Sequence, residues 1–155
     1  MTNEPSYDQQ LALNAYWKDI GGSVMLPGTD RAADRFVRAS YYLQQAPKTS
    51  EERGAVAAMF SIVRNTSVPM GVSRPGHPNL ATTLWRTVSE QKNRTYFFES
   101  TTSPDVFWVS MDKLKLGDGA STLKLDLSGN PDLAGDVAGR FKPATPFKFL
   151  SPAKQ

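Results

Sequence analysis

The sequence predicts an α+β fold in which helices come first and an antiparallel sheet follows. Apolar residues recur at helical spacing from Tyr7 to Val63, whereas beyond Pro78 they alternate with polar residues at a period of two. The two parts meet near Pro69-Met70-Gly71, which favours a turn. With 155 residues, of which 39% are hydrophobic, the chain is long enough to bury a core. We therefore expect two or three helices followed by an antiparallel meander.

Three segments of the first part have helical spacing. The first runs from 7 to 20 and ends at a pair of glycines. The second follows a turn and an N-cap residue within 26–30 and is closed by Pro47. The third begins at a capping box formed by Thr49 and Glu52. Its apolar stripe has the spacing i, i+3, i+4 and i+7 and consists of Val56, Met59, Phe60 and Val63.

The strands are expected at 82–89, 94–100 and 105–111, which are rich in aromatic and β-branched residues. Because short polar turns separate them, neighbouring strands must be antiparallel. A further strand is expected at 123–127, where leucines alternate with charged residues. From 128 to 155 prolines and glycines dilute the pattern. We therefore expect one domain over 1–127 and an extended tail over 128–155 that either packs on another surface or has no fixed contacts.

Three stretches of the chain, Thr2 to Tyr7, 34–39 and 83–100, together resemble the choloylglycine hydrolase and penicillin V acylase family of linear amide C–N hydrolases. Thr2 to Tyr7 is similar to the family's Thr-Asn-x-Pro-Thr/Ser-Phe segment, and 34–39, after the Leu-Pro-Gly turn at 26–28, is similar to its Ser-Arg-Phe-x-Arg element. The third stretch, 83–100, is similar to a hairpin of the Gram-negative branch. The resemblance implies an N-terminal-nucleophile hydrolase fold, an αββα sandwich, of which this chain forms the C-terminal portion.

The resemblance also implies catalytic roles for Asn3 and Arg35. Asn3 matches an asparagine whose amide stabilises the oxyanion of a tetrahedral intermediate. Arg35 matches an arginine beside the nucleophilic sulfur, where a fixed positive charge favours the thiolate. Asp34 stands where the family often has a small hydroxyl residue, so it is a candidate ion-pair partner that weakens Arg35. From the residues alone, Asn3 is also compatible with turn chemistry and Arg35 with a surface arginine, an interpretation that suits Arg38 better.

The nucleophile of the family is an N-terminal cysteine, and this sequence contains no cysteine. Thr2 becomes N-terminal if Met1 is removed, and such a threonine can act with its own amine as base, but the family's layout does not place the nucleophile there. The single histidine, His77, has no Gly-x-Ser-x-Gly elbow to accompany it and leaves little room for a metal site. We expect no nucleophile in this chain, no cofactor and no metal.

The resemblance implies a hydrolase of linear amides such as a conjugated bile salt, penicillin V or an N-acyl homoserine lactone. The chain is expected to be a fragment that is inactive without a missing N-terminal half or a homo-oligomeric partner. The alternative is a non-catalytic remnant or a partner-binding half-domain.

The composition argues against two other classes of partner. The 18 basic and 15 acidic residues are interspersed, which argues against nucleic acid. No apolar run approaches the roughly 20 residues that span a bilayer. The first residues lack the pattern of a signal peptide, so the resemblance implies a periplasmic location only for a longer exported protein.

Overall fold

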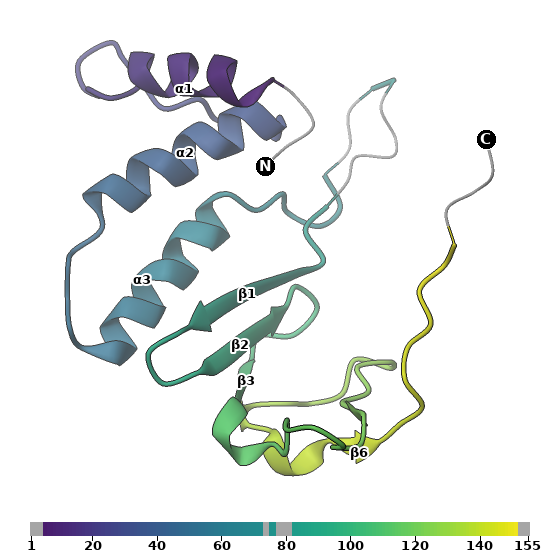
Figure 1. Ribbon diagram of the computed structural model, residues 1–155. Coiled ribbons are helices and arrows are strands. Elements are labelled where there is room, and N and C mark those ends of the chain that lie inside the picture. The colour runs from purple at the N-terminus through teal and green to yellow at the C-terminus, as the bar shows by residue number, and fades with distance from the viewer. Residues whose placement is uncertain (1–4, 73–74, 77–81, 152–155) are drawn as a thin grey trace. The chain divides into compact units, whose positions relative to one another are not determined.

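The computed structural model describes residues 5–72, 75–76 and 82–151. The chain divides into two units, 1–88 and 89–155, each of which is considered by itself. Helices occupy the first unit and strands dominate the second, so the predicted α+β class is confirmed (Figure 1). None of the three described helices has the length and apolar character that crossing a membrane requires.

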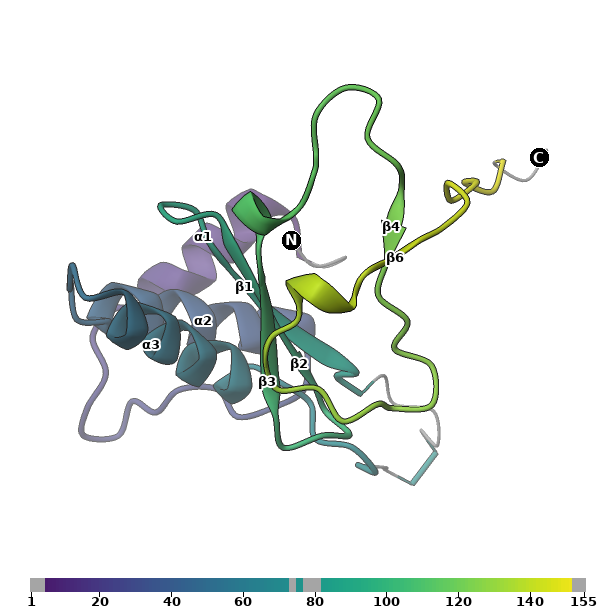
Figure 2. The ribbon, with the colours of Figure 1, turned by 90° about the horizontal axis from the view of Figure 1, so that it is seen from below.

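The first unit contains α1 (Tyr7–Tyr16), α2 (Ala32–Gln45) and α3 (Glu52–Asn65). Helix α2 contacts both α1 and α3, and the three lie side by side (Figures 1 and 2). The core of this unit is small and consists of Val37, Val56, Phe60 and Val68. The burial of Val56 and Phe60 confirms the apolar stripe that the sequence predicts for the third helix.

Helix α1 differs from its prediction in length and in its buried face. It ends at Tyr16 rather than residue 20, because the backbone N–H groups of the next two residues bond to carbonyls three positions back and close the last turn. Leu11, Leu13 and Tyr16 are exposed, although helical spacing suggested that they face the core. The buried residue is Gln10, with only 1% of its surface exposed.

Helix α2 ends as predicted, and both longer helices begin differently from their predictions. Helix α2 stops just before Ala46-Pro47, where proline cannot continue a helix. Its N-cap residue is Arg31, which makes no side-chain cap. The predicted capping box of α3 is wrong, because the cap is the carboxylate of Glu51, which accepts hydrogen bonds from the N–H groups of Arg53, at 2.8 Å, and Gly54.

The predicted hairpin is present in the second unit. Strands β2 (Thr95–Ser100) and β3 (Val106–Ser110) are antiparallel, with Phe97 opposite Trp108. The preceding strand β1 (Trp85–Glu90) contains the boundary between the two units. In the turn after β1, the carboxylate of Glu90 accepts hydrogen bonds from two backbone N–H groups, at 2.9 and 2.7 Å. This turn matches the short polar connection that the sequence predicts.

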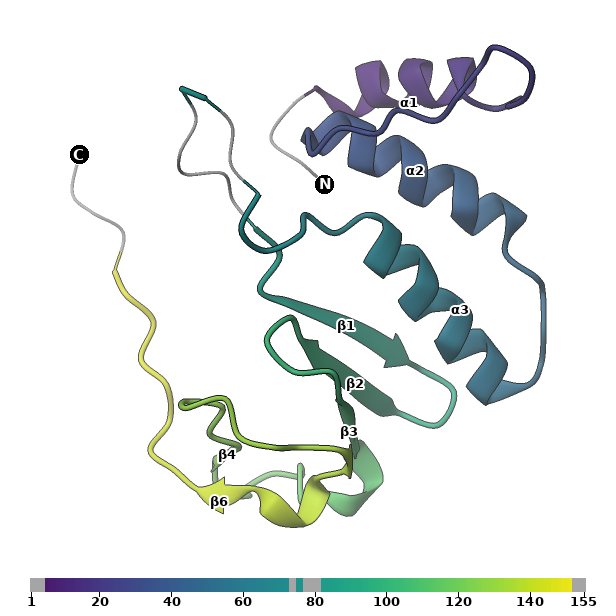
Figure 3. The same ribbon diagram turned by 180° about the vertical axis from the view of Figure 1, so that it is seen from behind.

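Short elements beyond the hairpin complete the second unit. Strand β5 (Gly135–Asp136) pairs in parallel with β3. Strand β4 (Leu123–Lys124) pairs antiparallel with β6 (Lys142–Pro143), and Figure 3 labels both strands. Two 3₁₀ turns, Met111–Lys113 and Ala138–Arg140, lie between these strands. The sequence predicted neither β5 nor β6, because two residues carry no periodicity. Within the predicted tail, Leu133 and Val137 are buried.

Candidate active site

Arg35 projects from α2 and lines a cavity of about 290 Å³ in the first unit. The opposite wall of this cavity consists of Thr82, Thr83, Leu84 and Trp85. The sequence predicted a strand from residue 82, but β1 begins only at Trp85, so Thr82 to Leu84 lie before the regular strand. Sequence reasoning missed this wall; its signal is a pair of hydroxyl residues directly ahead of an exposed Leu-Trp pair.

One residue of the wall, Thr83, is attached by hydrogen bonds to the segment that follows α3. The N–H of Thr83 donates to the carbonyl of Val68 at 3.1 Å, and the N–H of Val68 donates to the Thr83 hydroxyl at 3.0 Å. Next to it, Nε of Arg86 donates to the hydroxyl of Ser67 at 2.7 Å, and this hydroxyl donates to the carbonyl of Val63 at 2.8 Å. These bonds give the cavity a fixed wall that faces α2.

The guanidinium of Arg35 has an unused donor. Its Nε is buried and has no hydrogen-bond partner in the described part of the chain. The Asp34 carboxylate accepts a hydrogen bond from the Thr29 hydroxyl instead, and no ion pair joins Asp34 to Arg35 among the described residues. A buried donor without an acceptor costs about 1–3 kcal/mol, which is recovered when an acceptor enters. Although Asp34 replaces the small hydroxyl residue that the family often has, it does not pair with Arg35. The positive charge of Arg35 therefore remains available to the cavity.

Arg38 has a structural contact that the sequence interpretation missed. One of its terminal nitrogens, Nη1, donates to the carbonyls of Pro27 and Thr29, at 2.7 and 2.9 Å. Arg38 therefore fixes the Leu-Pro-Gly turn against α2, a role that the interpretation as a surface arginine did not include.

Helix α1 is attached to α2 by a polar ladder. The side-chain nitrogen of Gln10 donates to Oδ1 of Asn14 at 3.1 Å and to the carbonyl of Ala33 at 3.3 Å. The side-chain nitrogen of Asn14 donates in turn to the hydroxyl of Ser40 at 3.0 Å. The remaining oxygen of Gln10 is buried without a hydrogen-bond partner in the described part of the chain. This ladder fixes α1 against the helix that carries Arg35.

The other predicted site residues, Asn3, Thr2 and His77, lie outside the described residues. Among the described residues, no group of three or more histidine, aspartate and glutamate side chains is placed to hold a metal ion. Arg35 is thus the only predicted catalytic residue whose surroundings the structure describes.

Comparisons with known proteins agree with the resemblance seen in the sequence. Residues 1–130 match the family model of the linear amide C–N hydrolases, choloylglycine hydrolase family. The chain is 50% identical over 164 aligned positions to a penicillin V acylase of Pectobacterium atrosepticum, covering 96% of this chain and 44% of that protein. The structure of penicillin V acylase from Agrobacterium tumefaciens superposes with a TM-score of 0.83 at 51% identity, over 97% of this chain and 48% of that one.

The chain therefore spans slightly less than half the length of these relatives. The structural match confirms the predicted fold, a portion of an N-terminal-nucleophile hydrolase. On the match over residues 1–130 and the two relatives, this chain belongs to the choloylglycine hydrolase family of linear amide C–N hydrolases.

Proposed function

We propose that this chain contributes the Arg35 side of the active site of a hydrolase that cleaves linear amides. The observation that carries the proposal is the buried, unpartnered Nε of Arg35 beside a cavity, in a chain of this family. In amide hydrolysis, negative charge develops on the attacking atom and then on the carbonyl oxygen. A guanidinium keeps its charge when partly buried, and a donor fixed near that charge stabilises the transition state by several kcal/mol, about 3 kcal/mol in comparable sites.

The acyl group of the proposed substrate is apolar. Leu84 and Trp85, which line the cavity next to Arg35, are 61% and 57% exposed. Such side chains favour contact with an aromatic or aliphatic acyl group because it removes apolar surface from water. The names of the two relatives make penicillin V the first substrate to test, with conjugated bile salts and N-acyl homoserine lactones next.

The proposal requires a nucleophile from outside this sequence, because the chain contains no cysteine. We infer that an N-terminal cysteine on another polypeptide segment attacks the amide carbonyl, with its own α-amine handling the proton. Asn3 would donate its amide to the oxyanion, and Arg35 would favour the thiolate. Alone, the 155-residue chain is expected to be inactive.

The test is complementation. The chain is assayed for hydrolysis of penicillin V alone and after mixing with the cysteine-bearing N-terminal half of a related penicillin V acylase. We expect activity only in the mixture. Arg35→Ala should lower kcat/KM of the mixture by about 10²–10³-fold, and Arg35→Lys should restore only part of it.

Arg53→Ala is the matched control, because Arg53 is an exposed arginine at the start of the neighbouring helix α3. It should leave the rate unchanged. Equal rates for Arg35→Ala and Arg53→Ala in an active mixture would refute the role of Arg35. A mixture whose halves associate but do not hydrolyse any of the three substrate types would refute the amide hydrolase itself.

A second candidate is a half-domain that binds a partner without chemistry. It is favoured by the large apolar side chains that the chain exposes, including Tyr16 at 66% and Met25 at 74%. Surfaces of this kind are usually covered by another polypeptide. A monodisperse monomer with a cooperative thermal transition in sedimentation and melting experiments would argue against this candidate.

A further inference from the structure

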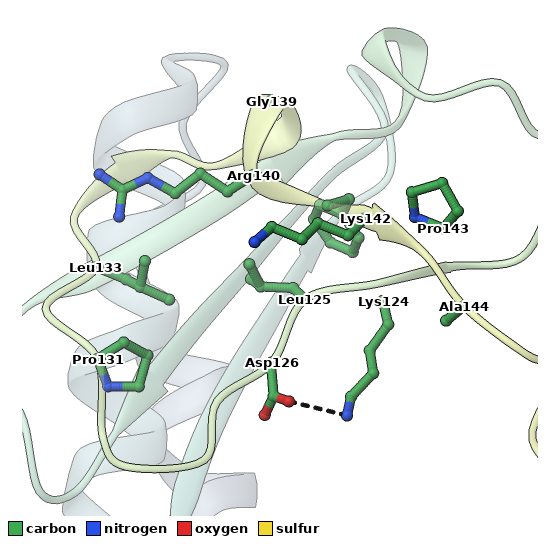
Figure 4. Close-up of a pocket in the computed structure, with 11 residues that line it drawn as sticks. Lys124, Leu125, Asp126, Pro131, Leu133, Gly139, Arg140, Lys142, Pro143 and Ala144 are labelled. Atoms are coloured by element: carbon green, nitrogen blue, oxygen red, sulfur yellow. Dashed lines mark hydrogen bonds and ion pairs between the residues drawn. The ribbon is translucent and has the colours of Figure 1, made fainter.

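The second unit contains a cavity of about 470 Å³ that lies outside the candidate active site (Figure 4). It is formed where β4 and the residues after it face the 3₁₀ turn at Ala138–Arg140 and strand β6. Small-molecule sites in proteins typically measure about 300–1,000 Å³ and combine an apolar lining with a few polar groups. This cavity has the size of such a site, and Arg35 is not among the residues that line it.

Most of the lining is apolar. Leu133 is only 5% exposed and belongs to the core of this unit, whereas Leu125 and Phe141 are half-buried. The apolar members of the lining are Leu125, Pro131, Leu133, Phe141, Pro143 and Ala144. A ligand with a small aromatic or aliphatic body would remove this surface from water, which is favourable by about 25 cal/mol for each Å².

One carboxylate and one of the lysines in the lining neutralise each other. The carboxylate of Asp126 accepts hydrogen bonds from the N–H of Ser128 at 2.9 Å and from Nζ of Lys124 at 3.0 Å. The backbone and side chain of Ser128, together with the hydrogen bond and the charge of Lys124, hold the pKa of Asp126 well below its usual range. Asp126 is therefore ionised at neutral pH and compensates the charge of Lys124.

Two further cations of the lining have no acidic partner. The side chain of Lys142 forms no ion pair or hydrogen bond with any described residue, and Figure 4 shows it extending toward Leu125. Arg140 makes one long hydrogen bond, of 3.4 Å, to the main-chain carbonyl of Asp132, and its guanidinium pairs with no carboxylate in the described part of the chain. The cavity thus combines an apolar lining with two positive charges that are not compensated.

We propose that this cavity binds a small amphipathic carboxylate, with its apolar body against Leu125 and Phe141 and its carboxylate between Lys142 and Arg140. A guanidinium and an ammonium are the preferred partners of a carboxylate, and their hydrogen bonds to it are stronger than those between neutral groups. A compact polyanion fits less well, because most of the lining is apolar and only two cations are free. The proposal stands independently of the proposed amide hydrolysis, although a hydrolysed acyl amide releases an acid of this class.

The test uses the 155-residue chain and three probes: phenoxyacetate, its neutral analogue 2-phenoxyethanol, and acetate. Binding is followed by NMR through the methyl signals of Leu125 and Leu133. Phenoxyacetate should shift both signals saturably, whereas the affinity for each of the other two probes should be lower by about tenfold or more. Equal binding of phenoxyacetate and 2-phenoxyethanol would overturn the proposal, and so would the absence of saturable shifts.

Charge variants locate the carboxylate. Lys142→Gln should weaken phenoxyacetate binding by about fivefold, as expected for the loss of one exposed charge, and Lys142→Arg should restore it. Lys92→Gln, at an exposed lysine in the turn after β1, is the control and should leave binding unchanged. Equal weakening by Lys142→Gln and Lys92→Gln would indicate nonspecific attraction and refute the site. Because Lys142 is exposed, its substitution is compatible with folding, which a thermal melt verifies.

Discussion

The buried amide of Gln10 provides a quantitative test of how α1 is held on α2. Its nitrogen bonds to Asn14 and Ala33, whereas its oxygen is buried without a hydrogen-bond partner in the described part of the chain. Gln10→Met keeps the shape of the side chain and removes both groups. The two lost hydrogen bonds cost about 0.5–1.5 kcal/mol each, and removing the unpaired oxygen relieves about 1–3 kcal/mol. These terms offset each other, so Gln10→Met should change the free energy of unfolding by only about 1 kcal/mol.

Gln10→Glu should behave differently although it changes a single group. At neutral pH the new carboxylate has no proton to donate and faces two acceptors, Oδ1 of Asn14 and the carbonyl of Ala33. A buried carboxylate in such surroundings has a raised pKa, often by about 3 units or more, and each unit corresponds to about 1.36 kcal/mol, so the penalty is about 4 kcal/mol. Because the folded-state pKa lies above the unfolded value of about 4.3, the penalty is absent below that value. It grows as the pH rises to the folded-state pKa and is constant above it.

Urea unfolding followed by circular dichroism between about pH 4 and pH 8 measures these differences. Gln44→Glu, at an exposed glutamine of α2, is the control and should stay within about 0.5 kcal/mol of the wild type. If Gln10→Glu does not fold at neutral pH, refolding on acidification gives the same result in qualitative form. A penalty that equals that of Gln44→Glu, or one that does not vary with pH, would contradict the burial of this amide between the two helices.

Two predictions concern strand β5. Asp136 accepts hydrogen bonds from Lys113 at 2.7 Å and from the N–H of Ala138 at 2.9 Å, which hold its pKa below the ordinary value of 3.8. A carboxyl with a lowered folded-state pKa stabilises the protein above its unfolded pKa and loses that effect as the pH falls, so Asp136→Asn should cost about 0.5–1 kcal/mol at pH 7 and nothing in strong acid. Melting temperatures of Asp136→Asn and the wild type, measured from pH 7 down to strong acid, test this prediction. A difference between the two proteins that persists unchanged in acid would be evidence against it. Gly135 has φ of +74° and open space where a Cβ would lie, so Gly135→Ala should cost about 1–2 kcal/mol through backbone strain alone. Gly139→Ala, with similar space and no positive φ, should be close to neutral, and equal melting temperatures for the two variants would exclude strain at Gly135.

Periodicity predicted the fold where an element is long and its apolar residues face a core. Helix α3 and the β2–β3 hairpin satisfy both conditions, and both are where the sequence places them. Strand β5 satisfies neither condition, because its two residues depend on parallel pairing with a strand far earlier in the chain. Helix α1 shows the opposite failure. It has apolar residues at plausible spacing, but polar hydrogen bonds rather than apolar burial hold it on α2, and periodicity does not register a buried glutamine.

In the candidate site too, some residues were predicted from the sequence and others were not. Arg35 was found through the motif after the Leu-Pro-Gly turn, and the structure places it beside a cavity. The opposite wall was not found, because Thr82 and Thr83 lie outside the regular elements and Thr83 is held by hydrogen bonds to Val68, in the segment after α3. The contact of Arg38 with the turn carbonyls also depends on folding, since Pro27 and Arg38 are eleven positions apart.

The geometry of α2 separates the stability of the first unit from the chemistry proposed for Arg35. Ala33 and Ser40, which accept the bonds from α1, are seven residues apart and share one helix face, whereas Arg35 lies about 200° around the helix from Ala33. Arg35, on the far face, has a buried Nε without a hydrogen-bond partner among the described residues. Arg35→Ala therefore removes the energetic cost of an unpaired donor and breaks no hydrogen bond, so it should not lower the melting temperature. It should nevertheless abolish most of the turnover in the complemented enzyme. Gln10→Glu should do the reverse, reducing the folded fraction while the remaining folded molecules keep their KM. A variant of Arg35 that lost activity only in proportion to lost stability would show that the guanidinium supports the fold and does not stabilise a transition state.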